Sequence, residues 1–195
     1  MSLLEIKEEI ERLGGIFPVP VDNPFPTLSQ QEITQLEDRF GKSLPEDYRD
    51  FLLEFGGCSF EQYALFSPKK VQAEFQPPED IDYVNTIIEG SLMAHFYGSD
   101  KGDDPLLQAY DIYKDRIPNL CLPIASDCFE SQIIMSLEDG TWGNIYWWDR
   151  EHEWDSKAYE EAHGGEKMPE LYKWQNVFFI CSGLTQFFKD LFLDE

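Results

Sequence analysis

The sequence predicts an α+β protein: one domain with a central, largely antiparallel β-sheet, flanked by an N-terminal helical corner and a C-terminal helix. Three observations predict this class. Apolar residues recur at helical spacing near both ends of the chain. Residues 92–149 contain successive short apolar runs separated by turn residues. The length of 195 residues suits a single domain over residues 1–195.

A helix and a connector are predicted over residues 1–27. The connector, residues 16–27, contains four prolines, which exclude regular helix and favour extended backbone in the residues before them. We therefore expect it to lie over the core as irregular chain. The helix is predicted by an apolar stripe that ends at Gly14 and consists of Leu3, Ile6, Ile10 and Leu13.

Residues 28–57 predict two short helices that pack as a corner. Ser29 and Glu32 have the spacing of a capping box, which stabilises a helix start by about 1 kcal/mol. Gly41 is suited to end this helix, Pro45 suits the first turn of the next one, and Gly56 would end that one. The apolar stripes are Ile33, Leu36 and Phe40 on the first helix, and Tyr48, Phe51, Leu52 and Phe55 on the second.

Strands are predicted over residues 59–66, 92–97, 109–113, 120–127, 131–137 and 143–149, and a further helix over 80–88. Only the turn signals at 127–130 and 138–143 separate the last three strands, so we expect these strands to be antiparallel neighbours. Residues 178–193 predict a closing strand and helix, with Ser182 as the helix cap.

Asp and Glu outnumber Lys and Arg by 38 to 15, which gives a formal net charge of −23. This charge repels nucleic acid and anionic lipid, and it attracts basic proteins, whose association it accelerates roughly 10- to 1,000-fold at low salt. Solubility alone is the alternative explanation. No apolar run approaches the roughly 18 residues of a membrane span and no signal peptide is recognisable, so a cytoplasmic protein is expected.

The sequence predicts no enzyme, no cofactor and no metal site. The histidines, His95, His152 and His163, belong to no nucleophile, phosphate-loop or dinucleotide motif. His152 has three acidic neighbours, but adjacent residues of one loop rarely converge on one ion. Asp127 and Asp149 follow strands, where we expect turn or cap roles. The cysteines lack metal-ligand spacing and are expected to be reduced, buried thiols: Cys58, Cys121, Cys128 and Cys181.

Motifs in the corner and the central strands resemble the SUKH superfamily, which includes the fungal Smi/Knr cell-wall regulators and many bacterial immunity proteins. The corner supplies Leu-Glu, then Leu-Pro-x-x-Tyr-x-x-Phe-Leu and Gly-Gly. The strands supply Tyr-Gly, Pro-Ile-Ala-Ser-Asp and Gly-Asn-Ile-Tyr-Trp-Trp-Asp, in the order that the family has. The matching residues are Leu36, Glu37, Leu44, Pro45, Tyr48, Phe51, Leu52, Gly56, Gly57, Phe96–Gly98, Pro123–Asp127, Ile133–Leu137 and Gly143–Asp149.

The chain departs from the family pattern in three places. Glu130-Ser131 stands where a Gly-Asn turn is usual. Residues 67–118 and 151–175 are long and acidic, and we interpret them as family-variable insertions. The second segment mixes carboxylates with aromatic residues, a composition typical of an interface against a basic protein; aromatics that fold back on the core are the alternative.

The resemblance implies a protein-binding function. The leading hypothesis is an immunity protein that binds a cognate, basic secreted toxin domain, often a nuclease, by covering its cationic groove with an acidic, aromatic-rich face. The alternative is a regulatory or scaffold module without a toxin, and an enzyme with an unrecognised site is a third class. We expect a monomer or weak dimer that binds neither nucleic acid nor membrane. The predicted partner-binding residues are Trp147, Trp148, Asp149, Glu151, Glu153, Trp154 and Asp155.

Overall fold

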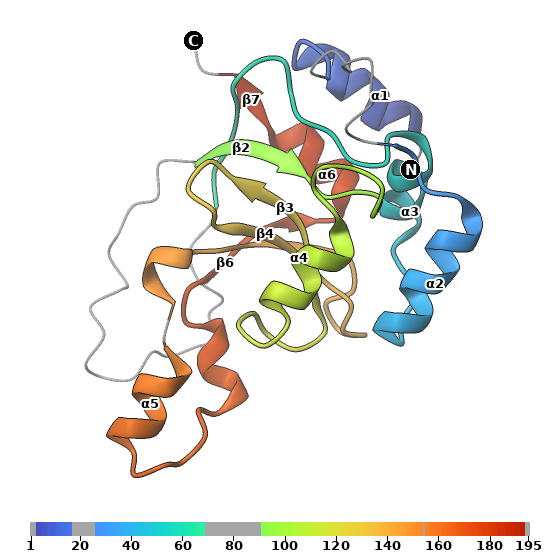
Figure 1. Cartoon of the computed structure of the whole chain (residues 1–195). Helices are drawn as coiled ribbons and strands as arrows, with labels where there is room; N and C mark the ends of the chain where they lie inside the picture. Colours follow the sequence, from blue (N-terminus) through green and yellow to red (C-terminus); the bar gives the residue numbers. More distant parts are fainter. Residues whose placement is uncertain (1–2, 17–25, 69–90, 154, 194–195) are drawn as a thin grey trace.

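The computed structural model describes residues 3–16, 26–68, 91–153 and 155–193 (Figure 1). Most helices lie toward the two ends of the chain and most strands lie in its centre. In chain order the elements are α1 (Leu3–Arg12), α2 (Gln30–Phe40), α3 (Glu46–Glu54), β1 (Ala64–Phe66), β2 (Ser91–Phe96), α4 (Leu106–Tyr113), β3 (Cys121–Asp127), β4 (Gln132–Ser136), β5 (Asn144–Trp148), the 3₁₀ helix η1 (Arg150–His152), α5 (Ser156–Ala162), the 3₁₀ helix η2 (Glu170–Trp174), β6 (Val177–Ser182), α6 (Leu184–Asp190) and β7 (Phe192–Leu193).

Within the described residues, seven strands form one sheet in the order β6-β5-β4-β3-β2-β1-β7, and neighbouring strands are antiparallel. Short turns join β3 to β4 and β4 to β5, as the tight links between their apolar runs predicted. The predicted α+β fold with a central antiparallel sheet is therefore confirmed. The acidic segment 67–118 supplies β2, so part of it lies inside the sheet.

One face of the sheet packs against helices that include α1, α3 and α6, and forms the large core. Aromatic rings fill its centre: the Phe51 ring centroid lies 5.2 Å from that of Phe96 and 5.7 Å from that of Phe188. All three side chains are fully buried. Burial of one such side chain stabilises a fold by roughly 1.5–3 kcal/mol. The apolar stripes predicted for the terminal helices supply much of this core.

The other face of the sheet carries a smaller apolar cluster. Tyr113 packs on Trp148 with 5.8 Å between ring centroids, and Trp174 packs on Tyr146 at 5.3 Å. We call this group the small cluster; its buried members are Ile117, Cys121, Ile134, Tyr146, Trp148 and Val177.

Helix α4 corrects the strand predicted over residues 109–113. Leu106 and Ala109 are both buried and lie three residues apart, which is the spacing of one helix face and not of one strand face. These two residues join the large core, whereas Tyr113 at the end of α4 packs on the small cluster. The helix therefore bridges the two apolar groups.

The capping box predicted for α2 is confirmed. Glu32 N donates to Ser29 Oγ at 3.3 Å, and the Glu32 carboxylate accepts from Ser29 N at 2.7 Å. Lys101 also pairs with Glu32, and these hydrogen bonds lower the pKa of the Glu32 carboxyl to about 2. Gly41 ends the helix with a left-handed φ of 65°, as expected for a glycine in this position.

The cap of α6 differs from the prediction. Ser182 is the last residue of β6, and Gly183, which has no side chain to cap with, occupies the cap position. A residue distant in sequence fills this role: Asp47 Oδ2 accepts from Thr185 N at 3.0 Å and from Thr185 Oγ1 at 3.3 Å. The start of α3 thus stabilises the start of α6.

Two glycines of the family-like motifs allow close backbone contacts at the end of the corner. A Cβ on Gly98 would lie 1.6 Å from the Gly56 carbonyl oxygen. Gly56 has a φ of 73°, and a Cβ there would lie 2.1 Å from the Pro26 carbonyl oxygen. A side chain at Gly98 would push the end of the Tyr-Gly motif away from Gly56, and a side chain at Gly56 would push Pro26 away.

Some predictions fall on residues that the structure does not describe, namely the helix over 80–88 and most of the proline-rich connector. Among the described helices, none combines the length and apolar character needed to cross a membrane. All four cysteines are free thiols. Cys58, Cys121 and Cys181 are buried as predicted, whereas Cys128 is exposed, which corrects the prediction for that residue.

Candidate functional site

The two tryptophans of the predicted partner-binding segment point to opposite faces of the sheet, because side chains alternate along a strand. Trp147 belongs to the large core and is only 8% exposed. Trp148 is fully buried in the small cluster, and the Arg116 guanidinium lies 5.1 Å from its ring. Both rings therefore lie beneath the surface and contribute almost no exposed contact area, and their role in partner binding stays a prediction.

Asp127 connects two of the family-like motifs. Its Oδ2 accepts from Trp147 Nε1 at 3.0 Å and from Ser91 Oγ at 2.8 Å. Its Oδ1 accepts from Phe129 N and Ser131 N, each at 2.9 Å, and so holds the turn between β3 and β4. The predicted turn role of Asp127 is confirmed, and its oxygens are occupied by these donors.

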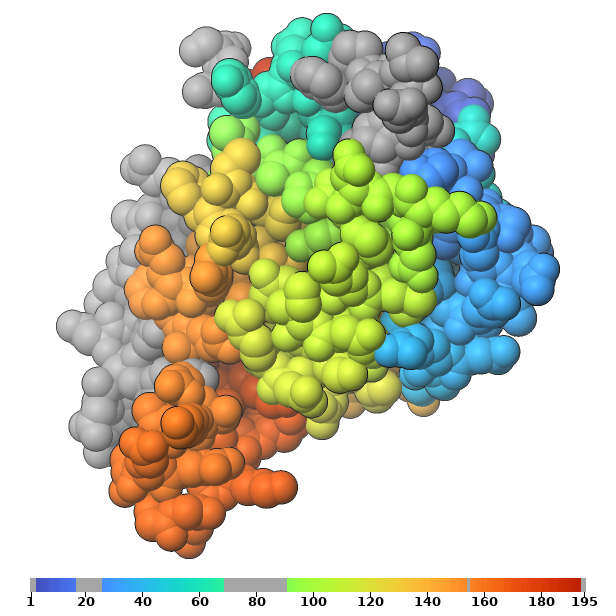
Figure 2. All heavy atoms as spheres, viewed as in Figure 1, coloured from blue at the N-terminus to red at the C-terminus, as the bar shows by residue number. Residues whose placement is uncertain are grey.

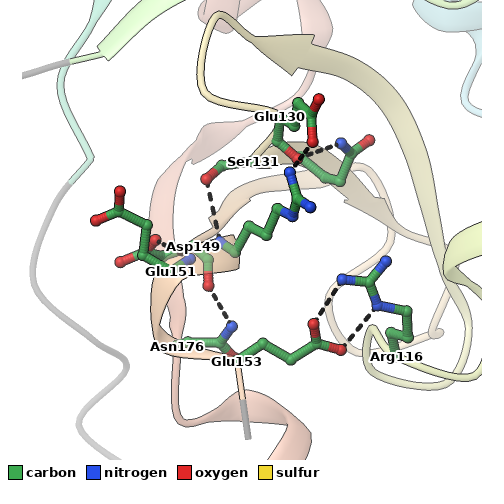
Figure 3. Close-up of polar contacts among 9 residues, drawn as sticks. Arg116, Glu130, Ser131, Asp149, Glu151, Glu153 and Asn176 are labelled. Atoms are coloured by element: carbon green, nitrogen blue, oxygen red, sulfur yellow. Dashed lines mark hydrogen bonds and ion pairs between the residues drawn. The ribbon is translucent and has the colours of Figure 1, made fainter. Parts of the chain in front are cut away.

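Asp149 is also a buried structural residue, at the start of η1. Its Oδ1 accepts from Glu151 N at 3.0 Å, so the predicted cap role is confirmed. Asn176 Nδ2 donates to the Asp149 carbonyl oxygen at 2.6 Å, and the Asp149 carboxylate contacts His152 Nδ1. Figure 3 shows the contact of Asp149 with Asn176.

The other predicted acidic residues differ in their surroundings. Glu153 forms a two-point ion pair with Arg116, in which Arg116 Nε lies 2.8 Å from Oε1 and a terminal nitrogen lies 2.5 Å from Oε2 (Figure 3). Glu151 and Asp155 are exposed, and Asp155 also caps α5. Trp154 lies outside the described residues. Glu151 and Asp155 thus present carboxylates at the surface, whereas the charge of Glu153 is balanced.

Aromatic residues of the segment 151–175 pack on one another or on the small cluster. The Tyr159 ring stacks on His163 at 3.9 Å and packs on Tyr172 at 5.5 Å. Trp174 packs on the small cluster through Tyr146. Figure 1 shows α5, in orange, projecting away from the sheet. Trp174 therefore folds back on the sheet, whereas Tyr159 and Tyr172 pack on each other.

A groove of about 230 Å³ lies on the same face of the sheet as the small cluster, beside α4. Strand pairing builds its floor, because His95 is opposite Ser126 and Ser126 is opposite Gln132. Trp148 is the next residue in this row, opposite Gln132. One row of paired residues therefore runs from the polar groove into the small cluster.

The walls of the groove combine acidic and apolar side chains. Asp103 and Asp104 come from the loop before α4, and Glu130 comes from the turn between β3 and β4. Ile112 and Tyr113 of α4 line it as well, and Ile112 is 51% exposed. Figure 2 shows α4, in light green, close to the yellow segment that contains this turn. Among the described residues, no lysine or arginine lines the groove.

Hydrogen bonds hold the floor of the groove. Tyr97 Oη donates to Gln132 Oε1 at 2.8 Å, and Gln132 Nε2 donates to the Glu130 carbonyl oxygen at 2.9 Å. Burial lowers the pKa of His95, although the nearby Asp104 carboxylate acts in the opposite direction. The imidazole is therefore neutral at neutral pH, and the carboxylates are the formal charges of the groove.

Ser126, His95 and Asp104 are the residue types of a hydrolase triad, but they lack its geometry. In a triad the hydroxyl and the carboxylate bond to opposite nitrogens of the imidazole ring. Here Ser126 Oγ lies at nearly equal distances from both ring nitrogens of His95, 3.3 Å from Nε2 and 3.5 Å from Nδ1, and Asp104 Oδ1 lies 3.3 Å from Nε2, so the hydroxyl is not directed at the nitrogen opposite the carboxylate. In addition, no group of three or more metal-ligating side chains occurs within the described ranges.

A comparison with known families identifies the fold. The SMI1 / KNR4 family (SUKH-1) matches residues 27–190, which include the corner, the sheet from β1 to β6 and α6. The chain belongs to this family. The resemblance of the corner and strand motifs is thus confirmed. The chain is also 31% identical over 128 residues to the SPbeta prophage-derived uncharacterized protein YokK of Bacillus subtilis (strain 168), and the alignment covers 65% of each protein.

Glu130 belongs to the turn in which this SUKH-1 chain departs from the usual Gly-Asn sequence, and this departure changes the edge of the groove. The backbone of Glu130 has a φ of 64°, a left-handed conformation that glycine adopts without strain. A glutamate in this conformation places a carboxylate at the edge of the groove. Arg150 forms an ion pair with this carboxylate.

Sequence reasoning did not identify the groove of this SUKH-1 protein. The floor residues come from three strands, and their juxtaposition depends on a pairing order that the sequence left open. Two signals were available in the sequence: the Gly-Asp-Asp run at 102–104 and His95.

Proposed function

We propose that this SUKH-1 protein is an immunity protein that binds and neutralises a basic toxin domain. The observation that carries the proposal is the net charge of −23 on a fold whose family includes bacterial immunity proteins. The prophage origin in the name of the Bacillus subtilis relative is compatible with this role. The triad geometry missing at His95 supports a non-catalytic mode of action.

Charge provides the mechanism. A toxin that acts on nucleic acid needs a cationic groove for phosphates, and an acidic protein surface competes for it. Long-range attraction raises the association rate, while apolar side chains that lose water on contact slow dissociation. The candidate carboxylates are Asp103, Asp104, Glu130, Glu151 and Asp155; the candidate apolar contacts are Ile112 and Phe129, which are 51% and 67% exposed.

The first test is capture of the partner. The tagged protein is used to isolate binding proteins from its native host at low salt, and mass spectrometry identifies them. We expect a basic protein with a toxin domain that raised salt releases and whose activity this chain inhibits. A neutral or acidic regulatory partner, without inhibition of any activity, would contradict the proposal and favour the scaffold alternative.

The position of the binding face has a separate test with matched charge changes. Reversal of Glu151 and Asp155 to lysine is expected to lower the association rate about tenfold at low salt, because two attractive charges become repulsive. The control reverses Glu8 and Glu11, which are exposed on α1, the helix that packs on α3 and α6. Equal effects of the two double variants would contradict this position of the face.

A further inference from the structure

We propose that the groove beside α4 receives one cationic side chain, an arginine or a lysine, from a basic protein partner. This inference rests on the proposed function and names a contact that it requires. Pockets for small molecules and cofactors usually measure about 300–1,000 Å³. The groove, at about 230 Å³, is smaller than these and suits a single long side chain.

The charges of the groove select a cation. Asp103, Asp104 and Glu130 line it, and no described lysine or arginine does so. Arg150 balances part of the Glu130 charge, while Asp103 and Asp104 keep theirs beside the neutral ring of His95. Anionic ligands such as phosphate would meet these carboxylates without a compensating cation. A lysine or arginine gains two charge-assisted contacts at one position.

The floor of the groove provides hydrogen-bond acceptors. Ser126 and Gln132 are almost fully buried, and their side-chain oxygens belong to the polar end of the paired row. Tyr97 Oη donates its hydrogen to Gln132 and also interacts with Ser126, so the polar groups of the floor form one connected set of oxygens. Ammonium and guanidinium groups have three and five N–H donors and no acceptor, which makes them complementary to this floor.

The walls suit the stem of the same side chain. Lysine and arginine bury their methylene groups along apolar surface while the charged end reaches polar groups. Pro105, Ala109 and Ile112 give the groove an apolar side next to its acidic one. The exposed side chain of Ile112 lines the groove, where a partner's surface would cover it, and the exposed Phe129 directly precedes the lining residue Glu130. The charged contact would then lie in a site from which water is excluded.

The probe for this site is N-acetyl-L-arginine amide, which carries the side-chain charge and no terminal charges. Its neutral isostere, N-acetyl-L-citrulline amide, is the matched control, and N-acetyl-L-lysine amide separates guanidinium from ammonium recognition. Titration into the labelled full chain is followed by amide chemical shifts. We expect saturable shifts at His95, Ser126 and Gln132 with one or both cationic amides, and none with the citrulline amide.

Variants make the titration specific. The double change Asp103→Asn and Asp104→Asn is expected to weaken binding of the cationic amide about fivefold to tenfold. Glu8→Gln and Glu11→Gln on α1 together remove the same charge from another part of the surface and are expected to leave binding unchanged. The unperturbed amide spectrum reports that each variant is folded. Equal shifts with the citrulline amide, or equal weakening by both double variants, would overturn the inference.

The captured partner separates this inference from the proposed function. If the chain and its Asp103→Asn, Asp104→Asn variant bind the same basic partner with equal affinity, the inference about the groove fails and the proposed function stands. If neither captures a basic partner, the proposed function fails. Two results together would support both the inference and the proposed function: the groove binds the cationic amides, and the double variant binds the basic partner at least fivefold more weakly than the unaltered chain does.

Discussion

The two faces of the sheet contrast in composition along the same strands. The face that packs on α1, α3 and α6 is apolar throughout its centre. The opposite face changes from apolar to polar along one row of paired residues. It is apolar where η2 and the end of α4 cover it, and polar where it forms the floor of the groove. In order across the sheet, this row consists of His95, Ser126, Gln132, Trp148 and Val177.

This contrast shows how one sheet can serve stability and recognition separately. A buried polar group without a partner costs about 1–3 kcal/mol. The groove avoids this cost in the absence of a ligand, because Tyr97 bonds to Gln132 and Ser126 lies within 3.5 Å of His95. The large core then supplies most of the stability, and residues on the groove wall can vary with little effect on folding.

Replacement of Phe51 by alanine is expected to have the largest effect, because it opens the aromatic centre of the large core. We expect the free energy of unfolding to fall by about 3–5 kcal/mol, measured by denaturant unfolding. Ile112→Ala, on the groove wall, is the apolar control and should change it by less than about 0.5 kcal/mol. Similar losses in the two variants would contradict the separation of the two faces.

The contact between α3 and α6 has an intermediate expected effect. Asp47→Ala removes the carboxylate that accepts from Thr185, so we expect a loss of about 1–2 kcal/mol in the free energy of unfolding. Asp47→Asn keeps an acceptor oxygen and should lose less. If the alanine and asparagine variants unfold at the same denaturant concentration, hydrogen bonding by Asp47 does not stabilise the start of α6.

The fold was largely predictable because its signals are local. The capping box at Ser29 and the apolar stripes of the helices depend on residues three or four positions apart, and the strands of the central hairpins follow one another directly. The errors have two causes. Asp47, a residue distant in sequence, replaces the predicted cap Ser182. Helix α4 follows Pro105 in a short segment whose apolar residues fitted a strand equally well.

The site was less predictable, for the same reason. Trp147 and Trp148 lie in a family-like motif and were predicted to bind a partner, yet strand alternation buries both. The groove combines a loop before α4, a turn and three strands, and no window of sequence contains them together. The composition predicted that the site would be acidic, but it did not predict where on the fold the site would lie. That position depends on the register that sets His95 opposite Ser126.

Glu130 tests whether stability and recognition can be separated at one residue. Glu130→Gly and Glu130→Ala both remove the groove carboxylate and its ion pair with Arg150, so both should weaken binding of the arginine amide equally. Only glycine relieves the left-handed backbone at φ 64°. We expect the glycine variant to be more stable than the alanine variant by about 1 kcal/mol in denaturant unfolding. An alanine variant of equal or greater stability would contradict backbone strain at this turn.

The smallest expected effect is a pH dependence that arises from His95. Burial lowers the pKa of His95 in the folded protein below the ordinary value of 6.5, so the unfolded chain binds more protons than the folded one just below pH 6.5. The contribution of His95 to the free energy of unfolding is fully present above pH 6.5. It is lost as the pH falls from 6.5 through the pKa that His95 has in the folded protein. His95→Gln cannot titrate, and its thermal midpoint should therefore fall less than that of the unaltered protein between pH 7.5 and 5. Parallel plots of thermal midpoint against pH for the two proteins would mean that the groove does not disfavour the charged form of the His95 imidazole. In that respect the floor of the groove would not differ from a solvent-exposed surface.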